Sequence, residues 1–331
     1  MKTVLITGGA GYIGSLLTGF LLNKGYKVKV IDELWFGGES IMPYFINNNF
    51  IFIKGNVCEI HKYEELFADV EVVVHFAAIV GFPACQQVGK ETAFKFNHEA
   101  TKKVFDVAES KGIKRFILAS TYSNYGISDD GKAVTEESPL YPQSIYAESK
   151  IKAEKYLLSK GINSYCAPVI PRFATLFGIS PRTRFDLIVN QFVLEAMTKR
   201  KLIIYQKNYN RSFVHIRDVI NAIYLMMEAE EDKIRNQIFN VGSDSGNCSK
   251  EDIIKMIQKN IPAVEVEYKD LSFGQDMRDV KVSFNKIEKI LGFKATITIE
   301  EGIKEVIKAI SDGLIKKPDD FKYLNHQFII Q

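Results

Sequence analysis

Two residues near the middle of the chain have the types and the spacing of a proton-transfer pair. Tyr146 and Lys150 lie four residues apart in a helical segment that follows a strand-like run at 116–119 and a hydroxyl-rich loop at 120–123. Side chains at this spacing share one face of a helix. A lysine ammonium near a phenol favours the phenolate and lowers the pKa of the tyrosine towards the value that a general base needs. The pattern therefore indicates a tyrosine that takes or returns a proton.

A glycine-rich turn at residues 7–14 has the composition of a phosphate-binding loop. Gly8, Gly11 and Gly14 follow a strand-like run and open a helical segment, in the spacing GxxGxxG. Glycine permits a tight turn and lets backbone N–H groups approach a pyrophosphate, while the helix N-terminus supplies a partial positive charge. The turn predicts a dinucleotide site; the alternative is a plain connection between a strand and a helix.

A carboxylate at the end of the second strand-like run indicates which dinucleotide would bind. Asp32 closes this run and is followed by Glu33, and the next basic residue is Lys54. A carboxylate at this place can bind both hydroxyls of an adenosine ribose, and it repels a 2′-phosphate. The alternative is a turn aspartate with no ligand. The sequence thus favours NAD over NADP.

The segments that must position these residues alternate between strand-like and helical patterns. Short β-branched runs recur through the first 170 residues, at 3–6, 28–31, 51–53, 72–75, 116–119 and 165–169. Segments with helical periodicity separate them. Such alternation predicts an α/β fold of the Rossmann type, with a doubly wound parallel sheet.

After Arg172 the pattern loosens and predicts a smaller, mixed α/β substrate-binding lobe. A loop rich in proline, arginine and glycine at 178–184 precedes a helical segment at 187–199. The segment 214–229 has a sheet-like pattern, so the chain is expected to return to the first domain. We assign 1–175 and a return segment of about 212–242 to the NAD-binding domain, 176–211 and 243–315 to the lobe, and 316–331 to a polar C-terminal appendage.

With these elements in order, the sequence resembles the extended branch of the short-chain dehydrogenase/reductase superfamily, which contains NAD-dependent nucleotide-sugar epimerases, dehydratases and reductases. The match spans nearly the whole chain, and its motifs occur in the order of the family. They are TGGAGYIG at 7–14, Asp32, HFAA at 75–78, Asn97, ASTYSNYG at 119–126, Tyr146 with Lys150, RFATLFG at 172–178, RSFVHIRDV at 211–219 and FNVG at 239–242.

The resemblance implies a catalytic role for three residues. Tyr146 would remove or return the proton of a sugar hydroxyl, Lys150 would bind the nicotinamide ribose, and Thr121 would hydrogen-bond the reacting oxygen. The positions implied for NAD binding are Gly8, Gly11, Tyr12, Ile13, Gly14, Asp32, Asn56, Val57, Ala77, Ala78, Asn97, Lys150, Arg172 and Phe173. Those implied for a nucleotide-sugar substrate are Ser123, Thr175, Arg182, Arg184, Asn190, Arg211 and Arg278.

Three positions depart from the pattern of the family. Asn56 stands where many members have an aspartate that receives the adenine amino group, and an amide oxygen can accept the same bond. The 4,6-dehydratases of this branch carry a glutamate, usually preceded by aspartate, directly after the catalytic threonine, whereas Tyr122 and Ser123 follow Thr121 here. Water cannot be eliminated without those acids, which argues against a dehydratase. Thr175 replaces an asparagine common near the sugar phosphates and leaves that contact open.

The stretch 172–192 resembles a bacterial subgroup that includes C4 dehydrogenases for GDP-linked heptose in capsule-sugar pathways, together with sugar-nucleotide epimerases. This favours a nucleotide-sugar 4-dehydrogenase of surface-polysaccharide biosynthesis, with GDP-manno-heptose as a candidate substrate. A 4-epimerase, a 4-keto-sugar reductase and a non-catalytic NAD-binding protein are the alternatives, and the nucleotide, the sugar and the direction of flux stay open. Alternatives for the arginines are an ion pair of Arg184 with Asp186 and solvated surface positions for Arg211 and Arg278.

Composition excludes several other classes of function. The 331 residues are 46% hydrophobic and 25% charged, as in a globular protein, and 43 Lys and Arg residues scattered among 40 Asp and Glu residues disfavour a nucleic-acid partner. The spacing of cysteines and histidines, His75 and His215 included, predicts neither disulfides nor a metal site. No run of roughly 20 apolar residues is present, so we expect no membrane insertion and a cytoplasmic protein. The resemblance implies a homodimer.

Overall fold

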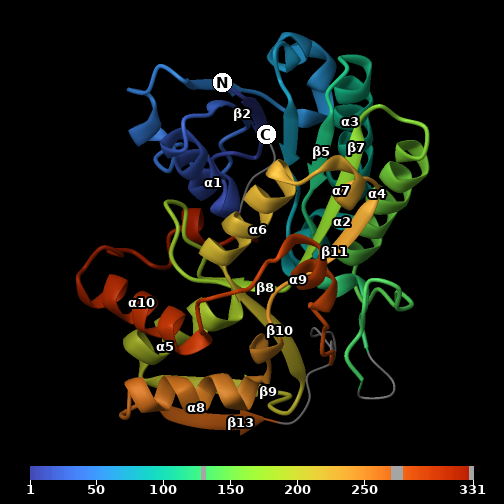
Figure 1. Cartoon of the computed structure of the whole chain (residues 1–331). Helices are drawn as coiled ribbons and strands as arrows, with labels where there is room; N and C mark the ends of the chain where they lie inside the picture. The colour runs from blue at the N-terminus through green and yellow to red at the C-terminus, as the bar shows by residue number, and fades with distance from the viewer. Residues whose placement is uncertain (128–131, 270–278, 328–331) are drawn as a thin grey trace.

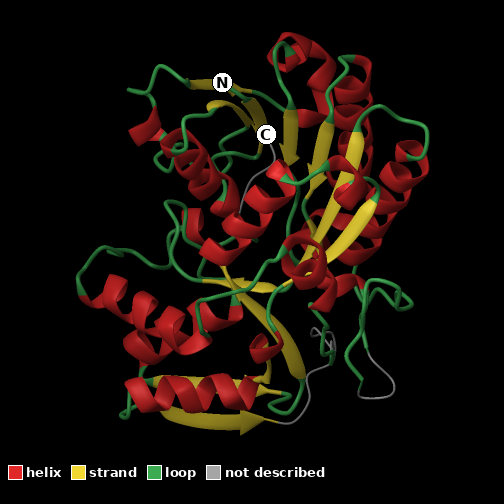
Figure 2. Ribbon diagram, in the orientation of Figure 1, coloured by secondary structure: helices red, strands yellow, loops and turns green. Residues whose placement is uncertain are grey.

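The computed structural model describes residues 1–127, 132–269 and 279–327, and its centre is an eight-stranded sheet with parallel pairing (Figures 1 and 2). The strands are β1 (Thr3–Thr7), β2 (Lys27–Asp32), β3 (Phe50–Lys54), β4 (Val72–His75), β5 (Arg115–Leu118), β6 (Ser120–Thr121), β7 (Ala167–Phe173) and β11 (Gln237–Val241). Their order is β11-β7-β5-β4-β1-β2-β3, with β6 paired to β7. The predicted Rossmann-type sheet is confirmed. Its order reverses between β1 and β4, and ligands bind at the carboxyl ends of the strands at such a point.

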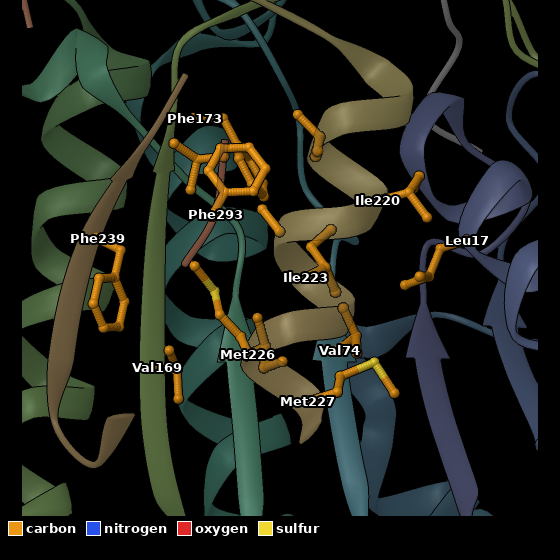
Figure 3. Close-up of a cluster of buried hydrophobic side chains, with 14 of the residues drawn as sticks. Leu17, Val74, Val169, Phe173, Ile220, Ile223, Met226, Met227, Phe239 and Phe293 are labelled. Atoms are coloured by element: carbon orange, nitrogen blue, oxygen red, sulfur yellow. The ribbon is translucent and has the colours of Figure 1, made fainter. Parts of the chain in front are cut away.

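Helices cover both faces of this sheet (Figure 1). On one face lie α1 (Tyr12–Asn23) and α6 (Ile216–Glu228), and on the other lie α2 (Phe82–Phe94), α3 (Ala100–Ser110) and α4 (Ile145–Gly161). Figure 3 shows the core under α6, where Ile223, Met226 and Met227 pack near Val74 and Val169 of the sheet. Burial of these side chains is the main source of stability for the domain.

The sheet-like expectation for 214–229 is wrong, because most of this segment forms the helix α6. Its buried positions include Ile216, Val219, Ile220, Ile223 and Met227, which recur every three or four residues. That spacing makes one apolar helical stripe. Several of these side chains are β-branched, which favours strands, but their spacing prevails over the intrinsic preference.

A smaller mixed lobe follows β7 in the chain and lies at the bottom of Figure 1. It has a three-stranded sheet and a two-stranded sheet, covered by helices that bury one apolar cluster. Its elements are β8 (Thr175–Phe177), α5 (Ile188–Lys199), β9 (Lys201–Tyr205), β10 (Asn210–His215), β12 (Asn247–Ser249), α8 (Lys250–Asn260), β13 (Glu265–Lys269) and α10 (Ile299–Ser311).

Three boundaries differ from the expected division. The strand β10 pairs with β8 and β12, so the return to the NAD-binding domain begins with α6 rather than at 212. The helix α9 (Asn285–Leu291) contributes Ile287 to the main core, with Phe284 and Phe293 beside it, so the segment 243–315 is shared between the two parts. Tyr323 and Leu324, in the segment expected to be a polar appendage, pack on the core of the lobe.

Short helical turns connect these elements. They are η1 (Met42–Tyr44), η2 (Val57–Phe67), the π-helical turn η3 (Lys95–Glu99), η4 (Tyr122–Asn124), α7 (Glu231–Ile234), η5 (Asp244–Gly246) and η6 (Phe321–Tyr323). Within the described ranges, no helix combines the length and the apolar character needed to cross a bilayer.

Candidate active site

One pocket gathers most of the residues that the sequence singles out. It lies at the carboxyl ends of the central strands, where the sheet order reverses, and the lobe bounds it through the loop 178–187. The sequence-predicted residues that line it are Gly8, Gly11, Tyr12, Ile13, Gly14, Asp32, Val57, Ala77, Ala78, Thr121, Ser123, Tyr146, Lys150, Phe173, Thr175, Arg182 and Arg184.

The glycine turn between β1 and α1 leaves no room for side chains at two of its positions. A Cβ at Gly8 would lie 2.7 Å from the Ala77 nitrogen, and Gly8 has a φ of +72°. A Cβ at Gly14 would lie 2.3 Å from the Gly8 carbonyl oxygen. Gly11 is the N-cap of α1 and supplies no capping side chain. The first N–H groups of α1 are therefore available to an anion such as a phosphate.

Asp32, the last residue of β2, lies in the pocket wall beside this turn. Its Oδ2 accepts a hydrogen bond from the Ala10 nitrogen at 2.9 Å, and its Oδ1 accepts one from the Leu34 nitrogen at 2.8 Å. Burial raises the pKa of the carboxyl, and these N–H bonds oppose that rise. The two bonds fix the carboxylate next to the turn.

The residues predicted to transfer a proton, Thr121, Tyr146 and Lys150, line the same pocket. Ser144 caps α4 by accepting from the Ala147 nitrogen at 3.1 Å, and the helix carries Tyr146 and Lys150 into the pocket wall. Thr121 comes from β6; its Oγ1 donates to Ser123 Oγ at 2.9 Å and accepts from the Ser123 nitrogen at 3.1 Å. Two hydroxyls, a phenol and an ammonium thus line one wall, as proton transfer to or from a substrate hydroxyl requires.

Lys150 is the most deeply buried of these groups, with 2% of its surface exposed. Burial lowers the pKa of its ammonium to about 8, although the nearby Glu154 carboxylate opposes the shift. The charged form still prevails at pH 7. A buried ammonium stabilises a negative charge on a nearby phenol more strongly than an exposed one does, because the local dielectric constant is low.

Comparison with known proteins identifies the family. A family model described as the NAD dependent epimerase/dehydratase family matches residues 4–242. The chain belongs to this family. It is therefore an NAD-dependent enzyme of the extended short-chain dehydrogenase/reductase type, and the finer subgroup is taken up below.

Relatives of this epimerase/dehydratase-family enzyme cover almost its full length. A low-salt glycan biosynthesis protein of Haloferax volcanii is 28% identical over 92% of this chain and 97% of its own length. The UDP-glucose 4-epimerase of Thermotoga maritima, solved with UDP-glucose, is 26% identical with a TM-score of 0.83, over 95% of this chain and 100% of that one. The UDP-glucuronic acid 4-epimerase of Bacillus cereus, solved with UDP-glucuronic acid and NAD, is 25% identical with a TM-score of 0.81, over 94% and 99%.

The residues of this family member fit NAD. The turn at Gly8 and Gly14 accepts only bare backbone, which leaves space for phosphates, and the Asp32 carboxylate stands where a ribose can donate hydroxyls. Ala77 and Ala78 line the pocket with little side-chain bulk. These groups would hold the diphosphate, the adenosine ribose and the middle of the cofactor, respectively.

A neutral variant of Asp32 tests this assignment. Asp32→Asn should weaken NAD binding by about tenfold, because it removes a charged acceptor for the ribose hydroxyls. It should also narrow the preference for NAD over NADP, because the repulsion of a 2′-phosphate is lost. Dissociation constants for both cofactors measure the effect, with Asp69→Asn as the control, since Asp69 is an exposed turn residue with a φ of +58°. An unchanged NAD-to-NADP ratio would contradict the role of Asp32.

Arg172 was expected at the cofactor, but it is not among the described residues that line the pocket. Neighbouring residues of a strand point to opposite faces, so Phe173 lines the pocket and Arg172 points away from it. Arg172 Nη2 lies 2.6 Å from Glu154 Oε2, its Nε donates to Oε1 at 3.1 Å, and its Nη1 donates to the Tyr125 hydroxyl at 3.0 Å. Burial would lower the pKa of Arg172, yet the paired carboxylate raises it above its ordinary value.

Glu154, which the sequence reasoning missed, is the centre of this buried network. It lies four residues after Lys150 on α4 and is 2% exposed. It also accepts hydrogen bonds from Ser120 Oγ and, at 2.8 Å, from Asn124 Nδ2. The network therefore joins the helix of Tyr146 to the segment that carries Thr121. A glutamate on the buried face of a predicted helix was the available signal.

Two asparagines expected at the cofactor, Asn97 and Asn56, are not among the described residues that line the pocket. Asn97 is fully buried in η3; its Oδ1 accepts from the Ile79 nitrogen at 2.7 Å, and its Nδ2 donates to the Ile79 oxygen at 2.9 Å. It thus fixes the chain just after Ala77 and Ala78. Asn56 accepts from the Cys58 nitrogen at 2.8 Å and donates to Glu33 Oε1 at 3.1 Å. Val57, which was expected at the cofactor together with Asn56, is among the described residues that line the pocket, and Asn56 is not.

Of the residues expected at the substrate, some line the pocket and others do not. Arg184 lines the pocket but forms the ion pair with Asp186 that was the alternative interpretation, at 3.0 and 2.8 Å. Asn190 was expected at the substrate, but its side chain is fully buried and forms hydrogen bonds with the backbone of Gly178 and Arg184. It shapes the loop rather than lining the pocket.

Three further residues were expected at the substrate, and they differ in where the structure places them. Thr175 lines the pocket, and its hydroxyl lies 2.9 Å from that of Tyr122. Arg211 is 1% exposed within β10, so it is not a solvated surface arginine, and it lies outside the described lining of the pocket. Arg278 lies outside the described residues.

Several lining residues carried no signal in the sequence. Asn325, near the end of the chain, is buried against the pocket and accepts a hydrogen bond from Arg182 Nη1. Trp35 and Phe36 follow Asp32 and line the same end. Nothing in the spacing of these residues distinguishes them from packing or loop residues, because their roles depend on long-range contacts.

The buried histidines have structural partners. His75 Nδ1 lies 2.7 Å from Thr7 Oγ1 and its Nε2 lies 3.0 Å from Thr101 Oγ1, and burial lowers its pKa to about 3. His215 caps α6 by accepting from the Arg217 nitrogen. The described residues contain no cluster of three metal-ligating side chains.

Proposed function

We propose that this enzyme oxidises a nucleotide-linked sugar at C4 and releases the 4-keto product, as a nucleotide-sugar 4-dehydrogenase. The observation that carries the proposal is the placement of Thr121, Tyr146 and Lys150 in one pocket with the cofactor turn. Solved relatives of similar fold bind UDP-glucose and UDP-glucuronic acid, which supports a nucleotide sugar as the substrate class.

The chain supplies binding and proton transfer for this oxidation. NAD, when bound, accepts hydride from the sugar carbon. Tyr146 takes the proton from the C4 hydroxyl, and the Lys150 ammonium stabilises the phenolate that does so. When substrate binds, Thr121 turns its hydroxyl proton from Ser123 Oγ to the reacting oxygen, and the Ser123 nitrogen, which donates to Thr121 Oγ1, holds the threonine oxygen in place. One proton and one hydride leave the alcohol, so a ketone remains.

Neutral residues beside Thr121 support oxidation without loss of water. The carboxylates among the described lining residues are Asp32 and Glu33, both at the adenosine end of the pocket. Tyr122 and Ser123 occupy the two positions where 4,6-dehydratases carry acids, and the Tyr122 hydroxyl lies beside Thr175. A hydroxyl and a phenol are far weaker acids than a carboxyl, so they cannot replace those groups.

The candidate substrate is GDP-manno-heptose, in bacterial surface-polysaccharide biosynthesis. Support comes from the resemblance of residues 172–192 to heptose C4 dehydrogenases, and from Arg184 of that stretch, which lines the pocket. A UDP-glucose 4-epimerase-like reaction is the second candidate, favoured by the Thermotoga maritima relative. It needs the same Thr, Tyr and Lys, followed by rotation of the ketone and return of hydride.

One experiment distinguishes the 4-dehydrogenase from the 4-epimerase. Enzyme and excess NAD are combined with GDP-, UDP-, CDP- and dTDP-sugars, GDP-manno-heptose included, and NADH absorbance is followed before the sugars are examined by NMR. Accumulating NADH with one sugar supports a dehydrogenase and names its substrate. An altered sugar without net NADH replaces the proposal with an epimerase. If neither NADH nor an altered sugar is detected, the dehydrogenase and the epimerase are both contradicted. The remaining candidate is then the reverse reaction, that of a 4-keto-sugar reductase.

A homodimer and a cytoplasmic location remain part of this proposal. The helices α2 and α4 pack side by side, with Lys90 of α2 bonded to Glu148 of α4 at 2.8 Å. Two such helices per subunit can form a four-helix bundle with a second copy. Sedimentation of the purified protein as a monomer at micromolar concentration would contradict the dimer.

A further inference from the structure

Arg182 is a buried cation in the pocket wall that forms no ion pair with a carboxylate of the described residues, although Asp186 and Asp32 are close enough to act on its charge. It is 6% exposed, and its Nε and Nη2 make no hydrogen bond within the described ranges. Its Nη1 donates to the neutral amide oxygen of Asn325. Burying a guanidinium with unsatisfied donors is unfavourable, and burial accordingly lowers the pKa of Arg182 to about 9. A ligand anion would supply the missing acceptor.

The surroundings place Arg182 near the phosphate-binding turn. Its Cζ lies 3.9 Å from the centre of the Phe36 ring, in the segment that follows Asp32. The loop that carries it is fastened to the first turn of α1 by two bonds. The Tyr12 hydroxyl donates to the Gly178 oxygen at 2.8 Å, and Ser180 Oγ donates to the Tyr12 oxygen at 2.6 Å. Arg182 therefore belongs to the cofactor end of the pocket.

The charges in the pocket wall assign a separate task to each cation. Lys150 lies on α4 one turn from Tyr146, and Arg184 is paired with Asp186 through two hydrogen bonds. Among the described lining residues, Arg182 is the cation that remains for a second anion. A diphosphate at the N-terminus of α1 carries two negative charges, and a guanidinium matches the geometry of phosphate oxygens.

We propose that Arg182 binds the diphosphate of NAD from the side of the lobe, and that Asn325 is its positioning residue. The segment 320–327 delivers Asn325, and the Tyr323 ring packs on Phe185 with the ring centres 5.6 Å apart. The Asn325 nitrogen also donates to Asp186 Oδ2 at 3.2 Å. The cofactor site thus takes residues from the glycine turn, the lobe loop and the end of the described chain. This holds whichever sugar is oxidised.

Affinity for ADP-ribose tests the proposal without any turnover, because this probe has the diphosphate of NAD and lacks nicotinamide. Calorimetry on the cofactor-free full chain compares ADP-ribose with GDP and UDP. Arg182→Leu should weaken ADP-ribose binding by about 10- to 100-fold, the range for hydrogen bonds to a charged group, and leave GDP and UDP binding unchanged. Arg217→Leu is the control; Arg217 is exposed, pairs with Glu305 and lies outside the pocket.

Two outcomes would overturn the proposal. Weaker GDP or UDP binding with unchanged ADP-ribose binding would assign Arg182 to the diphosphate of the substrate. Unchanged binding of all three probes would make Arg182 a packing residue on Phe36. Because Arg182→Leu removes a buried cation that forms no ion pair with a described carboxylate, its melting temperature should be no lower than that of the unmodified protein.

Substitutions of Asn325 separate positioning from simple packing. Asn325→Asp keeps an oxygen that accepts from Arg182 and adds a negative charge that neutralises it. We therefore expect ADP-ribose affinity to fall at least as far as in Asn325→Ala, while the melting temperature of Asn325→Asp is maintained. If Asn325 only fastened the segment 320–327 to the lobe, Asn325→Asp would bind ADP-ribose as the unmodified protein does, and that result would reject the positioning role.

Discussion

Replacing Tyr146 with phenylalanine should lower turnover by about 10²- to 10⁴-fold, because the substrate hydroxyl loses the group that takes its proton. The ring that lines the pocket is retained, so NAD binding should be unchanged within error. Steady-state turnover on the sugar identified by the NADH and NMR assay, together with calorimetric NAD titration, measures both quantities. The pair of results distinguishes loss of chemistry from loss of the site.

The control for this substitution lies on the same helix. Tyr156 of α4 lies outside the pocket, and its hydroxyl donates to Asp106 Oδ1 at 2.6 Å. Tyr156→Phe removes a phenol hydroxyl from the same helix and should leave turnover unchanged. Undiminished turnover in Tyr146→Phe would refute the mechanism. Absence of turnover in the unmodified protein with every sugar tested, and also with 4-keto-sugars and NADH in the reverse direction, would favour the non-catalytic alternative.

The second large effect is expected from Glu154→Gln, which keeps the volume of the side chain but removes its charge. Arg172 would then be a buried cation without its carboxylate, and breaking a buried pair in this way costs about 3–5 kcal/mol of unfolding free energy. Urea unfolding measures the change, with an unaltered m-value as the sign that folding stays two-state. The loss should also disturb the link between α4 and Thr121, since Ser120 and Asn124 share the carboxylate.

An exposed glutamate provides the comparison. Glu288 pairs with Lys294 at 2.9 Å, and both side chains are more than half exposed. Exposed ion pairs are screened by solvent and contribute little, so Glu288→Gln should unfold at the same urea concentration as the unmodified protein. Equal stability of Glu154→Gln and Glu288→Gln would show that the buried pair is not needed for folding.

The parallel sheet of the NAD-binding domain could be predicted because its signals are local. Six of the eight strands of this sheet overlap with one of the short β-branched runs, and parallel pairing follows from the helical segments between runs. The helix α6 was mistaken for sheet because β-branched content was weighted above spacing. The contribution of α9 to the main core had no local signal, since it depends on a contact between segments far apart in the sequence.

The sequence could predict which residue types form the site, but it could not predict the direction in which each side chain points. Motif positions placed Thr121, Tyr146, Lys150 and Asp32 in one pocket, yet could not tell that Arg172 and Asn97 point behind its wall. Side-chain direction depends on the face of the strand or helix that meets the core. Asn325 could not be found at all, because its partners, Arg182 and Asp186, come from a distant loop.

The position of Asn325 also has a consequence for protein synthesis. The glycine turn leaves the ribosome before the rest of the cofactor site, and Asn325 follows some three hundred residues later, at roughly 5–20 residues per second. The sheet can begin to form early, but its edge strand β11 and the last contact of Arg182 come from the final third of the chain. A nascent or prematurely terminated chain could thus fold around its first strands and still present an incomplete cofactor site.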